Sequence, residues 1–274
     1  MFELFRVDEP EDGDMSFVEH LDHLRPRLLR AVVALFVFII VAFAFGDELM
    51  AVIMGPKSEW FPTNRLFAWL AESSGKEFLR INSGELTLIN TAMAGQINLH
   101  IRMAFYTAIL LAVPYLLWEL WGFVKPALTR EEQRKSRFFV LEVSLCFFVG
   151  VLFGYFVLSP LSVNFLGSYS MSEQLSNMID ISSYMSLISN MVFVCGVIFL
   201  LPILSRVLAR MGVLTAAFMR KYRRHAIVVL AVLAALITPP DVASMVLVMI
   251  PLYALYEFSI HIVAGVEKSL KRES

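Results

Sequence analysis

The stretch Tyr184–Leu204, YMSLISNMVFVCGVIFLLPIL, contains 21 consecutive residues without a charge. The hydrocarbon core of a bilayer is about 30 Å thick, and a helix rising 1.5 Å per residue needs about 20 apolar residues to cross it. Because no water in the hydrocarbon can pair with the backbone, a segment that spans it must be helical. The stretch therefore predicts a transmembrane helix and decides the class of fold.

Five further apolar segments extend this pattern along the chain. Three are long enough to cross a bilayer, each with one charged residue near an end: Leu28–Phe45, Met103–Trp121 and Phe138–Leu158. The other two, Ala226–Ile237 and Val242–Phe258, are shorter, and a helix cannot cross the turn Thr238-Pro239-Pro240-Asp241 that joins them. We expect these two to form a helical hairpin that either spans a thinned bilayer or re-enters it. The predicted fold is all-α: a polytopic membrane protein with six transmembrane helices, the last two short.

Composition agrees with this class and excludes others. The chain has 274 residues, of which 58% are hydrophobic and 17% are charged. Soluble domains are about 45–50% apolar and about 25% charged, and disordered chains are more polar still. A formal net charge of −1 argues against a nucleic-acid partner, which would require a strongly basic surface. The two cysteines, Cys146 and Cys195, lie in apolar runs and are interpreted as small core residues rather than a disulfide or metal site.

The placement of positive charge predicts the orientation. If the six segments cross in turn, 18 of the 23 lysine and arginine residues fall on the side that holds the N-terminus, and the positive-inside rule places both termini in the cytoplasm. Ala42-Phe43-Ala44 resembles a cleavage site, but the acidic residues before it and the long apolar run favour a retained first helix. The predicted organisation is an acidic tail over residues 1–15, a transmembrane domain over 16–266 with a long periplasmic loop over 46–101, and a cytoplasmic tail over 267–274.

The long loop is rich in aromatic residues near its start, and two interpretations of it remain open. Its aromatic residues there are Trp60, Phe61, Phe67 and Trp69. Such residues suit an interfacial helix lying on the membrane, and they equally suit a small packed cap.

Three polar stretches could carry function. The first begins with Ser16 and Glu19 at capping-box spacing. This spacing predicts a helix that starts at Phe17, and Pro26 should kink or break it. A plain amphipathic lead-in helix explains much of this stretch, although its mixture of histidines, carboxylates and arginines exceeds what an anchor needs.

The second stretch, residues 114–134, leaves the membrane, turns at Pro126 and starts a helix with Thr129 and Glu132 at capping-box spacing. Interfacial tryptophans and that cap explain most of it. The third stretch is the hairpin turn at residues 236–242, which is more often a turn than a site.

In their order and spacing, these stretches and the six-segment layout resemble the TatC family, the receptor subunit of the twin-arginine protein translocase. The resembling residues are His20-Leu21-x-x-Leu24-Arg25-x-Arg27-Leu28, Trp121-x-Phe123-x-x-Pro126-Ala127-Leu128 with Glu132, Phe153-Gly154-Tyr155-Phe156 with Pro160, and Leu236-x-Thr238-Pro239-Pro240-Asp241. The resemblance covers about residues 16–262.

The resemblance implies a multi-pass protein of the bacterial cytoplasmic (inner) membrane that works without enzymatic activity. It implies that the chain binds twin-arginine signal peptides with a TatB-type partner and, with a TatA-type partner, moves folded proteins across the membrane using the proton-motive force. These single-span partners and several copies of the chain would form a hetero-oligomer. We expect no cofactor and no metal, and the sequence contains no Walker A, dinucleotide, zinc-hydrolase or serine-hydrolase motif.

The resemblance also suggests which residues read the signal peptide. Arginine pairs with a carboxylate through two parallel hydrogen bonds, which lysine cannot copy. The family's acceptor in the first cytoplasmic loop falls on Glu132, with Phe123 as its apolar neighbour. The predicted binding set, which adds residues of the lead-in helix, is Glu19, Asp22, Leu24, Arg25, Phe123 and Glu132.

The lead-in helix departs from the family pattern at one of these acceptors. The family's second acceptor is a glutamate in this helix, and its position holds His23 here. Histidine cannot replace a carboxylate as the partner of an arginine, because its neutral ring has a single acceptor nitrogen and its protonated ring is a cation. Glu19 lies one helical turn before His23 on the same face, and Asp22 is adjacent, so these two are expected to support Glu132.

A second departure concerns contacts with partner helices. The family often has a buried glutamate in the fourth span, and Leu200 occupies that position here. The predicted partner-contact set is Leu200, Thr238 and Asp241. Polar residues earlier in the same span are an alternative: Ser186, Ser189 and Asn190.

The remaining ionisable residues near span ends are interpreted as interfacial rather than as a proton relay: Glu119, Glu142, Glu257 and His261. Two other classes of function compete with a translocase. A small-solute secondary transporter would need inverted repeats, and the two halves of the chain show no visible similarity. A purely structural scaffold would not need the glutamate-bearing loop.

Overall fold

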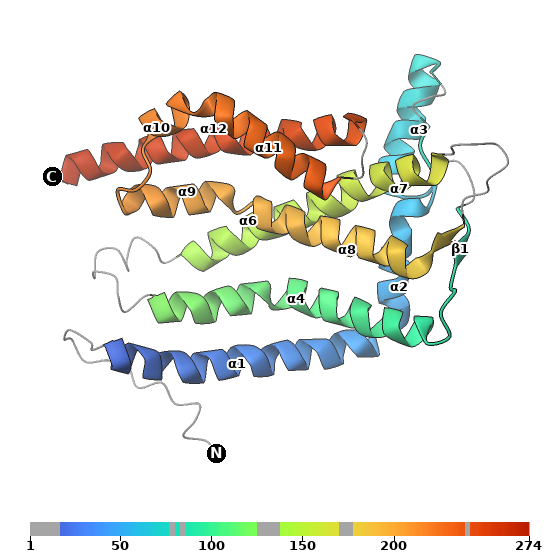
Figure 1. The fold of residues 1–274 in the computed structure, drawn as a ribbon, viewed down its shortest axis with the longest axis horizontal. Helices are drawn as coiled ribbons and strands as arrows, with labels where there is room; N and C mark the ends of the chain where they lie inside the picture. Colours follow the sequence, from blue (N-terminus) through green and yellow to red (C-terminus); the bar gives the residue numbers. More distant parts are fainter. Residues whose placement is uncertain are drawn as a thin grey trace. The chain divides into compact units, whose positions relative to one another are not determined.

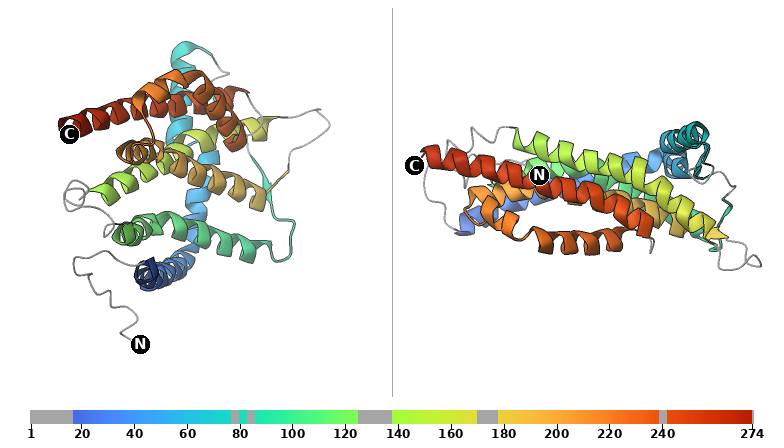
Figure 2. Two further views of the ribbon diagram at one scale, coloured as in Figure 1. Left: turned by 60° about the vertical axis from the view of Figure 1, so that its left-hand side comes forward. Right: turned by 90° about the horizontal axis from the view of Figure 1, so that it is seen from above.

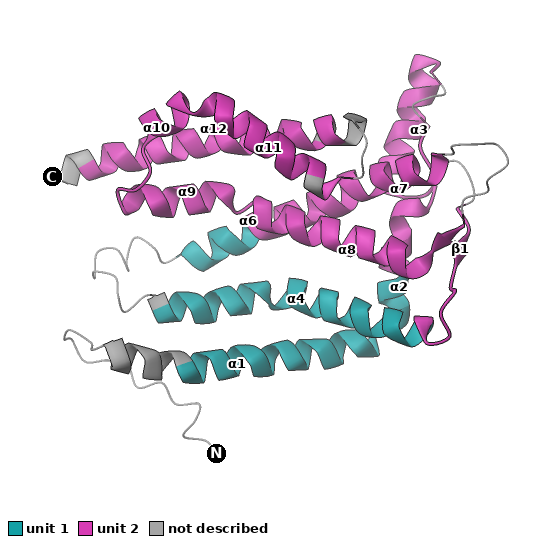
Figure 3. Ribbon diagram, in the orientation of Figure 1, with its two compact units in different colours: residues 1–50, 96–145 teal, residues 51–95, 146–274 magenta. Residues whose placement is uncertain are grey.

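The computed structural model describes residues 17–76, 80–82, 86–124, 138–169, 178–238 and 242–273. The chain forms two compact units, one made of residues 1–50 and 96–145 and the other of residues 51–95 and 146–274 (Figure 3). Within the described residues, five helical stretches are long and apolar enough to cross a membrane: Arg25–Ala44, Gly95–Phe123, Phe139–Ser168, Ile181–Arg210 and Val248–Leu270. The all-α membrane fold is confirmed, with two strands of two residues each as its only described departure.

The first unit is built mainly on two long helices, α1 (Phe17–Ala44) and α4 (Gly95–Val124), which run side by side (Figures 1 and 2). The helix expected to start at Phe17 does so, and it continues through Pro26 without a break. Over residues 25–44, Ala42 is the single fully buried side chain of α1, and its apolar face, formed by Ala31, Ala34, Leu35, Phe38 and Ile39, is half-buried.

Polar and aromatic contacts attach α1 to α4 near both ends. At one end, the rings of Phe43 and His100 stack with centroids 4.0 Å apart, and His100 Nε2 lies 2.9 Å from the Phe43 carbonyl oxygen. At the other end, Arg30 contacts Glu119. A helix with so few buried apolar side chains depends on such contacts for its position within the unit.

Two segments expected to be uninterrupted helices are divided near prolines, and both divisions lie in the second unit. The third span consists of α6 (Phe139–Phe153), a π-helical turn, η5 (Gly154–Leu158), and α7 (Ser159–Ser168). The fourth span consists of α8 (Ile181–Ile198) and α9 (Leu201–Arg210). Pro160 and Pro202 have no backbone N–H and crowd the carbonyl four residues earlier, which explains both irregularities.

The C-terminal hairpin differs from expectation in the length of its second arm. A short helix, α10 (Ala216–Lys221), leads into α11 (Arg223–Ile237), which ends just before the expected turn. The second arm, α12 (Val242–Glu273), has 32 residues, so the expectation that both arms are short is wrong. Its extension is stabilised because Ile260 and Val263 are buried in a cluster with residues of α9 and α10. The charged residues expected to form a tail over 267–274 continue the helix as far as Glu273.

The long loop contains a packed cap, which is one of the two structures expected for it. Its elements are α2 (Gly46–Met54), the 3-10 turn η2 (Gly55–Lys57), α3 (Pro62–Ser74) and β1 (Leu88–Ile89). In the second unit, β1 pairs in parallel with β2 (Ile179–Asp180), and α3 runs across the direction of α7 and α8 (Figure 1). Trp60 and Trp69 remain 82% and 61% exposed.

Two buried asparagines hold the cap together. Asn64 Nδ2 donates to the carbonyls of Pro56 and Ser58, at 3.0 and 2.7 Å. Asn82 Nδ2 lies 3.2 Å from Asn64 Oδ1 and donates to the carbonyl of Pro160 in α7 at 2.9 Å. The cap is therefore attached to a transmembrane segment by hydrogen bonds that water does not reach.

Close backbone packing joins the third and fourth spans. A methyl group added at Gly150 would lie 2.5 Å from the Cys195 carbonyl oxygen, and one added at Gly154 would lie 2.9 Å from Val192 Cα. Glycines four residues apart on one helix face let two helices approach at the backbone. Cys195 is buried in this region, Cys146 is half-buried, and the two do not form a disulfide.

Acid should weaken the start of α8. The side chain of Asp180 caps this helix by accepting from the Ser182 amide at 2.8 Å, and it also accepts from Thr91 Oγ1 at 3.1 Å. The Ser182 amide, followed by the Thr91 hydroxyl, holds the pKa of Asp180 below its usual value. Since the folded pKa is depressed, the stabilisation is fully present above the unfolded pKa of about 3.9 and disappears as pH falls through the folded pKa.

We therefore expect the protection of amides in the first turn of α8, relative to their intrinsic exchange rate at each pH, to fall more steeply below about pH 4 in the wild type than in Asp180→Asn, which keeps a cap but does not titrate. Exchange measured by mass spectrometry on the detergent-solubilised protein tests this. The same steep loss of protection in Asp180→Asn would contradict it.

Candidate functional site

Glu119 is a buried carboxylate near the end of α4 that leads to residues 125–137. Its residue exposure is only 6%, although the sequence suggested an interfacial residue. Tyr115, one turn earlier on the same helix, donates its hydroxyl to Glu119 Oε1 at 2.9 Å. This bond fixes the orientation of the carboxylate and leaves Oε2 for other partners.

Two arginines of α1 occupy that second oxygen. Arg30 Nη2 lies 3.1 Å from Glu119 Oε2, and Arg27 Nη1 lies 4.0 Å from the same atom. The side chains of Arg27 and Arg30 are 17% and 27% exposed, so both guanidiniums are partly desolvated. Two cations around one anion leave the cluster with a net charge of +1, and each cation lowers the cost of burying the carboxylate.

The pairing is nevertheless incomplete. Among the described residues, the buried Nε of each guanidinium has no hydrogen-bond partner, and of the two arginines Arg30 is the one within hydrogen-bond distance of the carboxylate. A bidentate arginine–carboxylate pair would use two parallel N–H groups, which is the stronger geometry. The cluster therefore holds arginine by fewer bonds than an arginine can make.

Gly122 lets Arg27 lie against α4. A Cβ at this position would come within 1.9 Å of Arg27 Nη1, so the guanidinium occupies the space that any other side chain would fill. Because Glu119, Gly122 and Phe123 lie within about one helical turn, the arginines contact α4 directly beside one of the predicted signal-peptide residues.

The second unit contains a similar cluster. Tyr253 donates to Glu257 Oε1 at 2.8 Å, and Arg223 Nη2 lies 2.7 Å from Glu257 Oε2. Tyrosine and glutamate are again four residues apart on one helix, with the arginine on the preceding helix. This cluster has one arginine for one glutamate, and its residues are more exposed than those of the Glu119 cluster, with side-chain exposures of 45% for Arg223 and 25% for Glu257.

The structure describes only part of the predicted signal-peptide set. Arg25 is exposed on α1, and Phe123 is half-buried near the end of α4. Glu132 lies outside the described residues, as do the side chains of three residues in the first turns of α1: Glu19, Asp22 and Leu24. The structure therefore does not show whether these residues come together.

The predicted partner-contact residues lie at interruptions between helices. Leu200 is half-buried and lies in the break between α8 and α9. Thr238 ends α11 and is 6% exposed, and its hydroxyl donates to the Ala234 carbonyl at 2.9 Å. This bond already uses the hydroxyl proton, leaving only its acceptor capacity. Asp241 lies outside the described residues.

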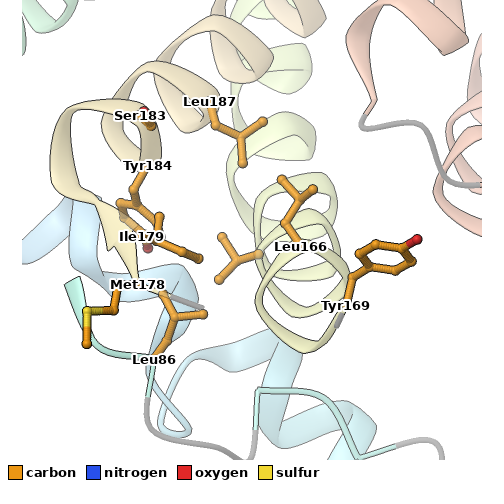
Figure 4. Close-up of a pocket in the computed structure, with 9 residues that line it drawn as sticks. Leu86, Leu166, Tyr169, Met178, Ile179, Ser183, Tyr184 and Leu187 are labelled. Carbon is orange, nitrogen blue, oxygen red and sulfur yellow. The ribbon is translucent and has the colours of Figure 1, made fainter. Parts of the chain in front are cut away.

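An apolar pocket of about 590 Å³ lies between α7 and α8 in the second unit (Figure 4). Leu166, Tyr184 and Leu187 are among its lining residues. Leu187 and Leu200 are 13 residues apart, or about 20 Å along continuous helix, so the pocket is distinct from the predicted partner contact. Within the described ranges, no cluster of three or more histidines, cysteines or carboxylates could hold a metal ion.

Sequence reasoning missed the pairing of Glu119 with the two arginines. The available signal was a tyrosine four residues before a glutamate on one helix, and arginines three residues apart on another. That pattern shows that each set shares a helix face, but it does not show which helices face one another.

Long apolar helices interrupted near prolines, a packed cap and ion-paired arginines near the helix ends define a multi-pass helical membrane protein. Within that class, residues 19–251 match the family model described as Sec-independent protein translocase protein (TatC). The chain belongs to the TatC family.

Related proteins agree over nearly the whole chain. The TatC protein of Blattabacterium from Periplaneta americana is 37% identical over 265 residues, which are 94% of this chain and 98% of that protein. The TatC protein of Deinococcus radiodurans is 33% identical, with 92% of this chain and 86% of that protein covered. A crystal structure of the twin-arginine translocase receptor TatC is similar with a TM-score of 0.68 at 28% identity, over 90% of this chain and 99% of that one.

Proposed function

We propose that the chain is the signal-peptide-binding subunit of a twin-arginine translocase. It binds twin-arginine signal peptides together with a TatB-type partner, and with a TatA-type partner it moves folded proteins across the bacterial inner membrane using the proton-motive force. Both termini lie in the cytoplasm. The family match, which spans both the Phe123 and Glu132 positions, carries this proposal.

The chemistry of the proposed site favours arginine over lysine. Glu132 supplies a carboxylate in the loop that follows α4, and Phe123 supplies apolar surface for residues beside the arginine pair. A guanidinium can make two charge-assisted hydrogen bonds with one carboxylate, whereas an ammonium acts as a point charge. A peptide with paired lysines should therefore bind more weakly than one with paired arginines.

The interruptions between helices are proposed as the place where partner helices dock. Leu200 lies where α8 ends before Pro202, and Thr238 lies where α11 ends before the hairpin turn. Partner helices can approach the backbone more closely at a break than along a continuous helix with large side chains. Asp241 adds a charged residue to the same hairpin turn.

Replacing Glu132 should abolish most of the selectivity for arginine. We expect Glu132→Gln to weaken binding of a twin-arginine peptide by at least about tenfold, since one hydrogen bond to a charged group is worth about 1.5–3 kcal/mol. Affinity is measured by fluorescence anisotropy of a labelled signal peptide on the chain co-purified with its TatB-type partner, with a twin-lysine peptide for comparison.

The neighbouring Glu131→Gln removes the same charge from the same loop and serves as the control, with binding expected to stay near that of the wild type. Equal binding of the twin-arginine and twin-lysine peptides by the wild type would overturn the proposed recognition. In vesicles, export of a folded twin-arginine cargo should stop when an uncoupler removes the proton gradient. Export that persists would overturn the proposed energy source.

A further inference from the structure

The Glu119 cluster is a site in which this chain already binds arginine. We propose that Glu119 is a second arginine acceptor for the signal peptide, and that Arg30 occupies it until the peptide arrives. This inference rests on the proposed function, because it assigns a further acceptor to the same ligand. It goes beyond that function in two respects: the further acceptor is Glu119, a buried carboxylate of α4, and Arg30 of the same chain competes with the peptide for it.

The position of Glu119 suits this role. Glu119 is one helical turn before Phe123, on the same face of α4. In the sequence, His23, which replaces the family's second acceptor, lies four residues before Arg27. The two arginines of the peptide then have two carboxylates as partners: Glu119 on α4, and Glu132 in the loop that follows α4 in the sequence.

The bonds within the cluster show why an exchange would be favourable. Arg30 holds Glu119 Oε2 through a single nitrogen at 3.1 Å, and its buried Nε has no partner in the part of the chain that the structure describes. A peptide arginine that approaches the same carboxylate can use two nitrogens. Meanwhile Tyr115 keeps its bond to Oε1, so the carboxylate need not reorient.

Of the two internal arginines, Arg30 is the one to leave. Its side chain is 27% exposed, against 17% for Arg27, and Arg27 is lodged over Gly122. A long arginine side chain near the end of a span can extend its guanidinium to the headgroups. Because its side chain is already partly exposed, Arg30 can leave Glu119 by changing its rotamer, without any movement of α1.

Charge balance requires an exchange rather than an addition. A third guanidinium beside Glu119 would place three cations around one carboxylate in a partly desolvated site, and like charges repel strongly there. Replacing Arg30 by a peptide arginine leaves the net charge of the cluster at +1. Arg30 is therefore a competitor of the peptide, and Glu119 is the residue for which they compete.

The test is a set of variants compared by peptide affinity on the chain with its TatB-type partner. Arg30→Gln should bind the twin-arginine peptide about tenfold more tightly, since the peptide no longer displaces a charged hydrogen bond. Glu119→Gln should bind about tenfold more weakly. In the double variant, Arg30→Gln should bring no gain over Glu119→Gln, because the carboxylate for which both arginines compete is gone.

Glu257→Gln is the matched control, since it removes the carboxylate of the similar cluster with Tyr253 and Arg223. Its affinity should equal that of the wild type. A gain in affinity in Arg30→Gln cannot result from misfolding, so this variant keeps the test decisive even if Glu119→Gln folds poorly.

The outcomes separate this inference from the proposed function. If the wild type does not prefer the twin-arginine peptide over the twin-lysine peptide, the proposed function fails. If the wild type prefers it and Glu132→Gln loses it, but Arg30→Gln binds like the wild type, the exchange is overturned and the proposed function stands. If Arg30→Gln raises the peptide affinity by the same factor in the wild type and in Glu119→Gln, the exchange is overturned as well.

Discussion

Gly150→Leu is expected to destabilise the protein by about 3 kcal/mol or more, because overpacking costs about 1–3 kcal/mol even where side chains can yield. Here the obstacles are mainly backbone. A Cβ at Gly150 would lie 2.5 Å from the Cys195 carbonyl oxygen and 2.9 Å from Gly196 Cα, with Phe199 Cβ at 2.7 Å. None of these atoms can move away by changing a rotamer, so α6 and α8 must separate.

Separation would affect more than one contact. The Phe147 ring lies over Gly196 on the opposite helix, where an added Cβ would be 2.7 Å from the ring, and a Cβ added at Gly154 would be 2.9 Å from Val192 Cα. Moving α8 outward at Gly150 therefore reduces contact at both neighbouring positions. Membrane helices associate largely through such close packing, since lipid is as apolar as the helix surface.

The measurement is the unfolding transition in mixed detergent micelles, followed by circular dichroism as the denaturing detergent is increased. Gly265→Ala on α12 is the control, since a Cβ there meets nothing within 4 Å. Alanine is about 1 kcal/mol better than glycine within a helix, so this control should match or exceed the wild type. A Gly150→Leu transition that coincides with the wild type would show that the close approach of α6 and α8 is not needed.

Asn82→Leu should have a comparable effect on the cap. Asn82 is 8% exposed, and the two hydrogens of its Nδ2 are shared among three acceptors: the Pro160 carbonyl at 2.9 Å, Asn64 Oδ1 at 3.2 Å and the Pro56 carbonyl at 3.3 Å. Leucine has the same branched shape but is bulkier and offers no donor. The Pro56 carbonyl keeps its bond from Asn64, and the other buried acceptors lose theirs at about 1–3 kcal/mol for each group left unsatisfied.

The backbone of Asn82 adds a second cost. Its φ is +52°, in the left-handed region where asparagine is tolerated and leucine is strained by about 1–2 kcal/mol. We expect a total loss of about 4 kcal/mol. Asn82→Gly separates the two causes, because glycine accepts this φ and keeps the backbone N–H that donates to Asn164 Oδ1 at 2.8 Å, but loses the side-chain bonds.

The readout is amide exchange of α3 and α7, which should accelerate together when the cap detaches. Asn98→Leu provides the control, since Asn98 is exposed on α4. The expected order of protection is wild type and Asn98→Leu, then Asn82→Gly, then Asn82→Leu. If Asn82→Leu is protected like the wild type, these hydrogen bonds do not hold the cap.

Most element boundaries could be predicted from local signals. The capping-box spacing predicted the helix start at Phe17, and the two prolines after Thr238 predicted the end of α11 at Ile237. Pro202 was visible in the sequence too, but the hydropathy of its surroundings favoured an unbroken helix, whereas the structure divides α8 from α9 there. Hydropathy reports burial in lipid and says nothing about a lost backbone hydrogen bond.

The C-terminal end of α12, in contrast, could not be predicted from local signals. Charged residues after its apolar part suggested a tail, because hydropathy alone ends the span there. Burial of Ile260 and Val263 beside Ala209 and Met219 stabilises the continued helix. That contact joins residues of three helices, so it was not available to any local rule.

The sequence by itself determined that the chain is a helical membrane protein and where most of its helices lie, since hydrophobicity and capping act within a few turns of one helix. It also contained the motifs by which the TatC family could be suspected before any fold was known. Only the tertiary structure decided which polar groups meet. Arg30 and Glu119 are 89 residues apart, and Asn82 and Pro160 are 78 apart. Such pairs form because helix packing brings their positions together in space, and no periodicity along the chain records that packing.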